Sequence, residues 1–244
     1  MPADLVEVMS SIQGEGLYVG TRQVFMRFLG CNLRCPYCDT PASFTEVREC
    51  RIEKTPGKRD FVTLPNPMQP EMAASILKFY DLHRHHSVSL TGGEPLLRVD
   101  FLLELIPLIR AQGAQRIFLE TNGTLPGNLE RLIDELDIVS MDIKLTGDTD
   151  WDAHTEFLQV AKRKEVYVKT VILAETTNAD FQQTVDLIAA VDRNVPLVLQ
   201  PVTPYGSIRR GPAPVRLIEL QDMATQQLAD VRVIPQTHKI MGQL

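Results

Sequence analysis

Short apolar runs alternate with longer amphipathic stretches along most of the chain. The runs are rich in β-branched residues and have the length of buried strands, whereas the stretches between them have the length of helices. The pattern predicts strands over 24–30, 87–90, 116–120, 138–144, 166–173, 197–200 and 231–234. It predicts helices over 70–80, 101–112, 127–136, 150–163, 180–191 and 216–229. This alternation is typical of an α/β fold in which helices cover a parallel sheet.

The number of repeats limits the architecture. About six β/α repeats are fewer than the eight of a closed TIM-type barrel, so we expect a partial (incomplete) TIM-type β/α barrel. No linker or internal repeat marks a boundary, and we expect residues 1–244 to form a single domain. The stretch at about 41–66 breaks the pattern because it is polar, rich in Arg and Lys, and contains Pro56-Gly57. We interpret it as an insertion.

Composition excludes several classes of protein. The chain has 244 residues, of which 44% are hydrophobic, and a net charge of −6. This acidic balance argues against binding nucleic acid through overall charge. No uncharged apolar run approaches the roughly 20 residues that span a bilayer, and the N-terminus lacks the basic and apolar regions of a signal peptide. We expect a cytoplasmic protein with no membrane partner.

Three of the four cysteines are clustered. Cys31, Cys35 and Cys38 have the spacing C-x3-C-x2-C, whereas Cys50 lies in the insertion and is interpreted as an unrelated thiol. In a reducing compartment such a cluster indicates a metal site rather than disulfides. A structural zinc takes four protein ligands, so a three-cysteine zinc site would need a histidine. A [4Fe–4S] cluster held by three cysteines leaves one iron open for another ligand.

A glycine pair and several polar strand ends accompany the cysteines. The sequence TGGEP (91–95) follows the next predicted strand, and polar residues follow or interrupt the strands at 120–124, 140–144 and 200–203. The carboxyl ends of strands in such barrels converge on one mouth. Together with the cysteine spacing, TGGEP resembles the radical S-adenosylmethionine (SAM) superfamily. The resemblance implies a [4Fe–4S] cluster on Cys31, Cys35 and Cys38, with SAM on its open iron. It implies cofactor-binding roles for Tyr37, Asp39, Gly93, Glu94, Ser140, Asp142, Lys144, Gln200 and Pro201.

The two ends of the chain narrow the resemblance. SIQGEG (11–16), MRFLGCNLRCPYCDT (26–40), ETNGT (120–124), SMDIK (140–144) and QTHK (236–239) together resemble the 7-carboxy-7-deazaguanine synthases, a family within this superfamily. The resemblance implies ring contraction of 6-carboxy-5,6,7,8-tetrahydropterin with loss of ammonia, in 7-deazapurine (queuosine) biosynthesis. It implies Mg2+ on Thr40, a flavodoxin or ferredoxin-type electron donor, and a homodimer. It implies substrate-binding roles for Ile12, Gln13, Gly14, Arg27, Thr91, His238 and Leu244.

Arg27 illustrates an alternative that the sequence leaves open. A guanidinium group recognises a carboxylate through two parallel hydrogen bonds, which suits the acid group of the pterin. In a strand, however, Arg27 shares its face with apolar Phe25 and Leu29, and a buried arginine there needs an anionic partner. A structural salt bridge to an internal carboxylate therefore remains the alternative.

Two other functions remain open at this stage. The first is a glycyl-radical-enzyme activase, which has the same cysteine spacing and acts on a protein partner. The second is a non-enzymatic zinc or nucleic-acid-binding module that uses the three cysteines and the basic residues of the insertion. The chain ends at 11–16 and 236–239 favour the pterin enzyme over both.

Overall fold

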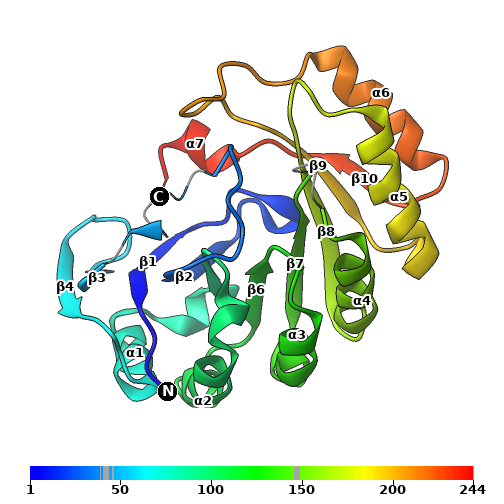
Figure 1. The fold of residues 1–244 in the computed structure, drawn as a ribbon. Coiled ribbons are helices and arrows are strands. Elements are labelled where there is room, and N and C mark those ends of the chain that lie inside the picture. Colours follow the sequence, from blue (N-terminus) through cyan, green and yellow to red (C-terminus); the bar gives the residue numbers. More distant parts are fainter. Residues whose placement is uncertain (39, 41–43, 46, 146–148, 244) are drawn as a thin grey trace.

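A single open sheet organises the molecule (Figure 1). The structure is a computed structural model that describes residues 1–38, 40, 44–45, 47–145 and 149–243. Neighbouring strands at the centre of the sheet are parallel and lie in the order β2, β5, β6, β7, β8, β9, β10. Their bounds are Arg22–Phe28, Ser87–Gly92, Ile117–Thr121, Ile138–Ile143, Glu165–Ile172, Leu197–Pro201 and Val231–Val233.

Three further strands extend the sheet beyond β2. β1 (Leu5–Ile12) runs antiparallel to β2, and β3 (Glu49–Glu53) runs parallel to β1. β4 (Phe61–Pro65) pairs antiparallel with β3 and forms the edge of the sheet. The sheet is therefore open at both ends, at β4 and at β10, as a partial TIM-type barrel requires.

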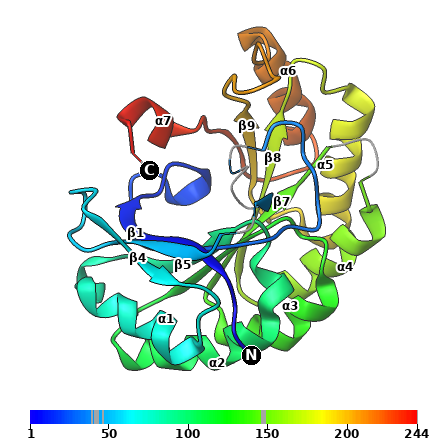
Figure 2. The same cartoon turned by 60° about the vertical axis from the view of Figure 1, so that its left-hand side comes forward.

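Helices cover one face of this sheet (Figures 1 and 2). The short helix α7 (Thr237–Met241) lies on the opposite side, beside the loop that follows β1. Within the described ranges, no helix combines the length and apolar character that crossing a membrane requires. The covering helices are α1 (Pro70–Ile76), α2 (Val99–Ala111), α3 (Pro126–Leu132), α4 (Trp151–Ala161), α5 (Asn178–Asp192) and α6 (Pro214–Thr225).

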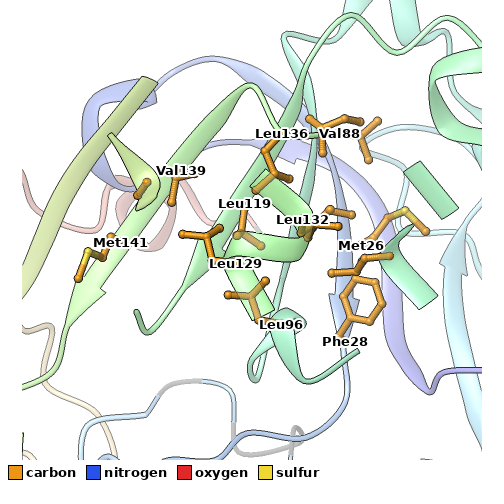
Figure 3. Packing of buried hydrophobic residues seen from close by; sticks show 14 of the residues in the cluster. Met26, Phe28, Val88, Leu96, Leu119, Leu129, Leu132, Leu136, Val139 and Met141 are labelled. Carbon is orange, nitrogen blue, oxygen red and sulfur yellow. The ribbon is translucent and has the colours of Figure 1, made fainter. Parts of the chain in front are cut away.

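The core lies between the sheet and the covering helices (Figure 3). Met26 and Phe28 of β2 are fully buried there with Leu119 of β6 and Leu129 of α3. Full burial of each such side chain contributes roughly 1.5–3 kcal/mol. Because side chains alternate along a strand, Arg27 of β2 points to the other face of the sheet.

The predicted partial barrel is confirmed, but the sequence pattern missed three strands. β1 was hidden because the polar residues Glu7, Ser10 and Ser11 interrupt its apolar run. The insertion does not lack regular structure, since β3 and β4 form a hairpin within it. Cys50 and Ile52 of β3 are fully buried, and the charged residues around them disguise a strand. Cys50 thus lies in the core.

Candidate active site

The carboxyl ends of the parallel strands surround a cavity of about 610 Å³. Open α/β sheets bind ligands at these ends, where the following loops converge. Residues of the segments 12–15 and 236–239 also line the cavity. The predicted residues in its wall are Ile12, Gln13, Gly14, Arg27, Cys31, Cys35, Tyr37, Cys38, Thr40, Thr91, Gly93, Ser140, Asp142, Lys144, Gln200 and His238.

Four predicted residues do not belong to this wall as described. Glu94 lies beneath the cavity and is fully buried, and Pro201 at the end of β9 is not part of the lining. Asp39 and Leu244 lie outside the described residues. The structure therefore brings most of the predicted residues to one cavity and leaves the placement of Asp39 and Leu244 unstated.

The glycine pair packs directly against the cysteine loop. The backbone N–H of Gly93 donates to the Phe28 carbonyl at 3.1 Å, and the N–H of Glu94 donates to the Gly30 carbonyl at 2.8 Å. A Cβ atom on Gly93 would lie 1.9 Å from the carbonyl oxygen of Gly30. Only glycine permits this approach, which holds the turn beside Cys31. We refer to the part of the cavity formed by 31–38 and Gly93 as the cysteine end.

The three thiols line the cysteine end, but they do not converge on the position of a single metal ion. Burial raises the pKa of Cys35 to about 11 and also raises the pKa of Cys31. The hydroxyl of Thr40 lies 3.5 Å from the Cys38 sulfur. Across the described part of the chain, no three His, Cys, Asp or Glu side chains lie close enough together to hold a metal ion.

Glu94 supports the floor of the cysteine end. Its carboxylate accepts hydrogen bonds from the backbone N–H groups of Leu96 at 3.0 Å and Asn122 at 2.7 Å. It accepts a third from the hydroxyl of Thr121 at 2.9 Å. Burial raises the pKa of Glu94 to about 7, because these neutral donors offset only part of the loss of water. The residue thus joins the turn after β5 to the end of β6.

Several polar atoms in the wall are buried without a partner. Asp142 Oδ1, Gln200 Oε1 and the hydroxyl of Tyr37 form no hydrogen bond within the described structure. Such atoms are uncommon in folded proteins and indicate a missing ligand or water. All three lie in the same cavity as the cysteines, and they suit a ligand that carries hydroxyl and amino groups. The residues present therefore fit SAM.

The segments at 11–16 and 236–239 meet at the other side of the cavity. The backbone N–H of Thr237 donates to the Gly14 carbonyl at 2.9 Å. A Cβ atom on Gly14 would lie 2.4 Å from the His238 side chain, so glycine is required for this contact. We refer to the part formed by Gln13, Gly14, Glu15, Gln236 and His238 as the terminal end. The terminal end thus brings together the segments 11–16 and 236–239, which the sequence analysis associated with substrate binding.

Glu120 connects two predicted substrate contacts. Its carboxylate accepts a hydrogen bond from the Gln13 amide at 2.7 Å and another from the Thr91 hydroxyl at 2.5 Å. The sequence placed Glu120 in a polar strand end but did not assign it a role. Its position at the end of β6, beside two cavity-lining groups, was the available signal.

Arg27 forms the salt bridge that the sequence offered as the alternative to substrate binding. Its Nε atom donates to Glu7 Oε1 at 2.9 Å, because Glu7 of β1 lies opposite Arg27 of β2 in the antiparallel pair. Both residues line the cavity. The carboxylate of Glu7 therefore holds the guanidinium group in the cavity wall.

Lys169 is a cavity residue that the sequence interpretation missed. It lies in the middle of β8, and its side chain is 12% exposed. Strands of a parallel sheet are covered on both faces, so a lysine within one needs an anionic partner. Its ammonium group donates to Glu15 and lies 3.3 Å from Asp142 Oδ2. The isolated lysine in the apolar run 166–173 was the signal that could have revealed it.

Comparison with known proteins identifies the class first. The model of the radical SAM superfamily matches residues 26–196, more than half of the chain. A solved structure of QueE from Escherichia coli shares the fold, with a TM-score of 0.63 at 22% identity. That match covers 97% of this chain and 94% of the other. The chain belongs to the radical SAM superfamily, and its cofactors are a [4Fe–4S] cluster and SAM.

Two relatives define the family within this class. The chain is 47% identical to a 7-carboxy-7-deazaguanine synthase from Geobacter sulfurreducens, over 99% of this chain and 98% of the relative. It is 36% identical to a protein of the same name from Methanothermobacter thermautotrophicus, with coverage of 99% and 98%. Within the superfamily, the chain is thus a member of the 7-carboxy-7-deazaguanine synthase family.

Proposed function

We propose that this chain is a carbon–nitrogen lyase that converts 6-carboxy-5,6,7,8-tetrahydropterin to 7-carboxy-7-deazaguanine, with loss of ammonia, in queuosine or related 7-deazapurine biosynthesis. Its family membership supports the reaction class. The observation that carries the proposal is the contact between Gly14 and the segment Thr237–His238 inside the cavity that the cysteines line. This contact forms a second, polar end opposite the cysteine end.

At the cysteine end, the chain's task is to hold the cofactors in a fixed orientation. Cys31, Cys35 and Cys38 would ligate the cluster, and Gly93 lines the cavity beside them, where SAM would bind. When bound, the cluster and SAM would supply the one-electron radical chemistry that the ring contraction requires. Further contacts to SAM are assigned to Tyr37, Asp39, Glu94, Ser140, Asp142, Lys144, Gln200 and Pro201.

At the terminal end and in the adjoining wall of the cavity, the chain's task is to orient the pterin. Arg27 is already held in the cavity wall by Glu7, so its remaining guanidinium donors suit the substrate carboxylate. Gln13 and Thr91, both bonded to Glu120, present ordered polar groups to the ring. The rigid placement of these groups lowers the entropy that binding loses. The remaining substrate contacts are assigned to Ile12, Gly14, His238 and Leu244.

The proposal includes Mg2+ on Thr40, which lines the cavity beside Cys38. Mg2+ keeps several waters and accepts few protein oxygens, so one hydroxyl together with substrate oxygens is a reasonable ligand set. The ion would neutralise and orient the substrate carboxylate. Mg2+ titration of the substrate complex, with Thr40→Val as the comparison, tests this part.

Partners and assembly form the last part of the proposal. The reaction needs one electron at a time, which supports a flavodoxin or ferredoxin-type donor. The edge strand β4, with a partly exposed Val62, and the exposed Met72 on α1 support a homodimer. The continuous sheet from β4 to β10 supports a single domain over 1–244. The cluster of reduced thiols supports a cytoplasmic location. Sedimentation equilibrium measures the oligomeric state.

A single anaerobic assay tests the proposed reaction. Cluster-loaded protein is incubated with SAM, dithionite and the carboxypterin, and the deazapurine is identified by its absorption and mass. The expected result is product that depends on SAM and on the reductant. Radical transfer to a partner protein without deazapurine would favour the activase. Zinc in place of about four irons per chain would favour the non-enzymatic module.

A further inference from the structure

Lys169 lies between the two ends of the cavity. β8 is the neighbour of β7 in the sheet, and Lys169 pairs in register with Asp142. Their side chains therefore leave the sheet side by side, on the face that lines the cavity. Glu15 approaches from the loop that follows β1 and reaches the same ammonium group. One buried cation thus contacts Glu15 of the terminal end and Asp142, which is a proposed contact of SAM.

Each of these carboxylates uses one oxygen for Lys169 and has a second oxygen for another purpose. Asp142 Oδ2 also accepts from the Lys144 ammonium at 2.5 Å, whereas Asp142 Oδ1 is buried without a partner in the described structure. Glu15 Oε1 accepts from the Gln236 amide at 2.7 Å, two residues before His238. Lys169 therefore helps to fix the rotation of both carboxylates, in the case of Asp142 together with Lys144.

The charged states of Lys169 and its two carboxylate partners depend on one another. Burial alone would raise the pKa of Glu15, but the adjacent Lys169 ammonium lowers it. Burial alone would lower the pKa of Lys169, but Asp142 and Glu15 raise it well above the usual value. The side chains of Lys169, Asp142 and Glu15 are only 12%, 10% and 21% exposed, so solvent screens these pairs weakly. Removing the cation would leave two carboxylates beside each other without their common partner.

We propose that Lys169 is a positioning residue that couples the two binding sites, because its ammonium group orients Asp142 toward SAM and Glu15 beneath the pterin at the same time. This inference rests on the proposed function. The ammonium group of Lys169 donates a hydrogen bond to Glu15 and forms an ion pair with Asp142 at 3.3 Å, so a change at one carboxylate is felt at the other. A ligand that immobilises one carboxylate also immobilises Lys169, and the second ligand then meets a site that is already ordered. Binding of SAM and binding of the pterin are therefore cooperative.

Calorimetry without reductant measures this coupling directly. Cluster-loaded, unreduced protein binds both ligands without turnover, so the affinity for the carboxypterin is measured with and without saturating SAM. In the unaltered protein, SAM should strengthen pterin binding about tenfold. In Lys169→Met, the ratio of pterin affinities with and without SAM should fall close to one. Lys169→Arg should keep part of the increase because the charge remains. Lys162→Met, an exposed lysine at the end of α4, is the matched control.

A second variant separates positioning from simple destabilisation. Lys169→Met leaves Glu15 buried without a cation, which by itself can unfold a protein. The double variant K169M/E15Q removes both charges, so it should recover thermal stability and iron content while still lacking the coupling. If Lys169 only stabilises the fold, the double variant would recover the coupling along with the stability.

Turnover provides an independent readout. With dithionite present, K169M and K169M/E15Q should release more 5′-deoxyadenosine per molecule of deazapurine, since the substrate is no longer aligned with the cofactor. The inference would be overturned if both variants kept the SAM-dependent gain in pterin affinity and the same amount of 5′-deoxyadenosine per deazapurine. A parent protein that neither binds nor converts the carboxypterin would instead overturn the proposed function.

Discussion

The two ends of the cavity are built in different ways. The cysteine end combines the loop at 31–38 with Gly93, and β2 and β5, which precede these segments, are neighbours in the sheet. The terminal end depends on contacts such as that between Glu15 and Gln236, which lie 221 positions apart. Strand pairing positions the first end, whereas the second forms only when the whole chain has folded. The first is consequently the easier one to infer from sequence.

The buried carboxylates Glu94 and Glu15 also differ in whether their surroundings are local or distant in the sequence. Glu94 accepts hydrogen bonds from neutral donors, and burial raises its pKa to about 7 although Lys144 acts in the opposite direction. Glu15 has the Lys169 ammonium beside it, which lowers its pKa despite burial. A carboxylate held by local backbone N–H groups serves as structural support, whereas one paired with a distant lysine depends on tertiary structure for its charge.

The largest expected effect is at the cysteine end. Cys35→Ala removes a proposed cluster ligand, so iron content and cluster absorption should be lost and product formation should fall by about a thousandfold or more. Cys50→Ala is the matched control because Cys50 is fully buried on β3, away from the cavity. It should cost about 1 kcal/mol of stability and keep the iron. Full iron content and activity in Cys35→Ala would disprove the assignment.

Substitution of Arg27 tests whether the cavity wall between the two ends binds the substrate carboxylate. If it binds the substrate carboxylate, Arg27→Met should raise KM for the carboxypterin by about 10- to 100-fold, the range expected for charge-assisted hydrogen bonds. The affinity for SAM should change little. Glu7→Gln removes the partner but retains Arg27, so it should raise KM by less than about tenfold. Equal effects of the two variants on KM would show that Arg27 acts only through the salt bridge.

Gly14 tests the terminal end alone. A Cβ atom would collide with His238 at 2.4 Å, so Gly14→Ala should displace the segment 236–239. We expect KM for the carboxypterin to rise about tenfold, with the iron content unchanged. Gly127→Ala, on α3 with nothing within 4 Å of its Cβ position, should leave KM unchanged. Loss of iron in Gly14→Ala would show that the two ends do not form independently.

The last expected effect concerns stability rather than activity, and it is a pH dependence at the cysteine end. The pKa of Glu94 is raised from 4.5 to about 7 on folding, so the folded state binds this proton more tightly than the unfolded state. Stability should therefore be highest below about pH 4.5 and fall as the pH rises to about 7, by roughly 3 kcal/mol. Urea unfolding of cluster-free protein from pH 5 to 8 measures this slope, and Glu94→Gln should flatten it.

Glu15→Gln serves as the comparison for that slope. The folded-state pKa of Glu15 is lowered, so its contribution is present above the unfolded value of 4.5 and is lost only as the pH falls further. The variant should therefore keep the slope between pH 5 and 7. A slope that Glu15→Gln flattens and Glu94→Gln leaves intact would reverse the assignment of the two carboxylates.

The parts of the fold that the sequence predicted share a simple pattern. The strands from β5 to β10 are apolar runs in a parallel sheet, and the helices between them are amphipathic, so their periodicity is visible. β1 was missed because its buried residues include Ser10 and Ser11, and β3 was missed because charged side chains flank its buried residues. Cys50 and Ile52, for example, are buried between charged neighbours. A strand that is buried on one face only has a weaker hydrophobic pattern in the sequence than a strand that is buried on both faces.

The sequence alone determined the chemistry of the cysteine end, because the spacing of Cys31, Cys35 and Cys38 and the glycine pair are local properties of the chain. Only the tertiary structure decided that Arg27 pairs with Glu7 and that Lys169 joins Glu15 to Asp142. The physical reason is that an ion pair depends on which charges meet in a water-poor interior. Residues more than 150 positions apart, as Glu15 and Lys169 are, meet only through the fold.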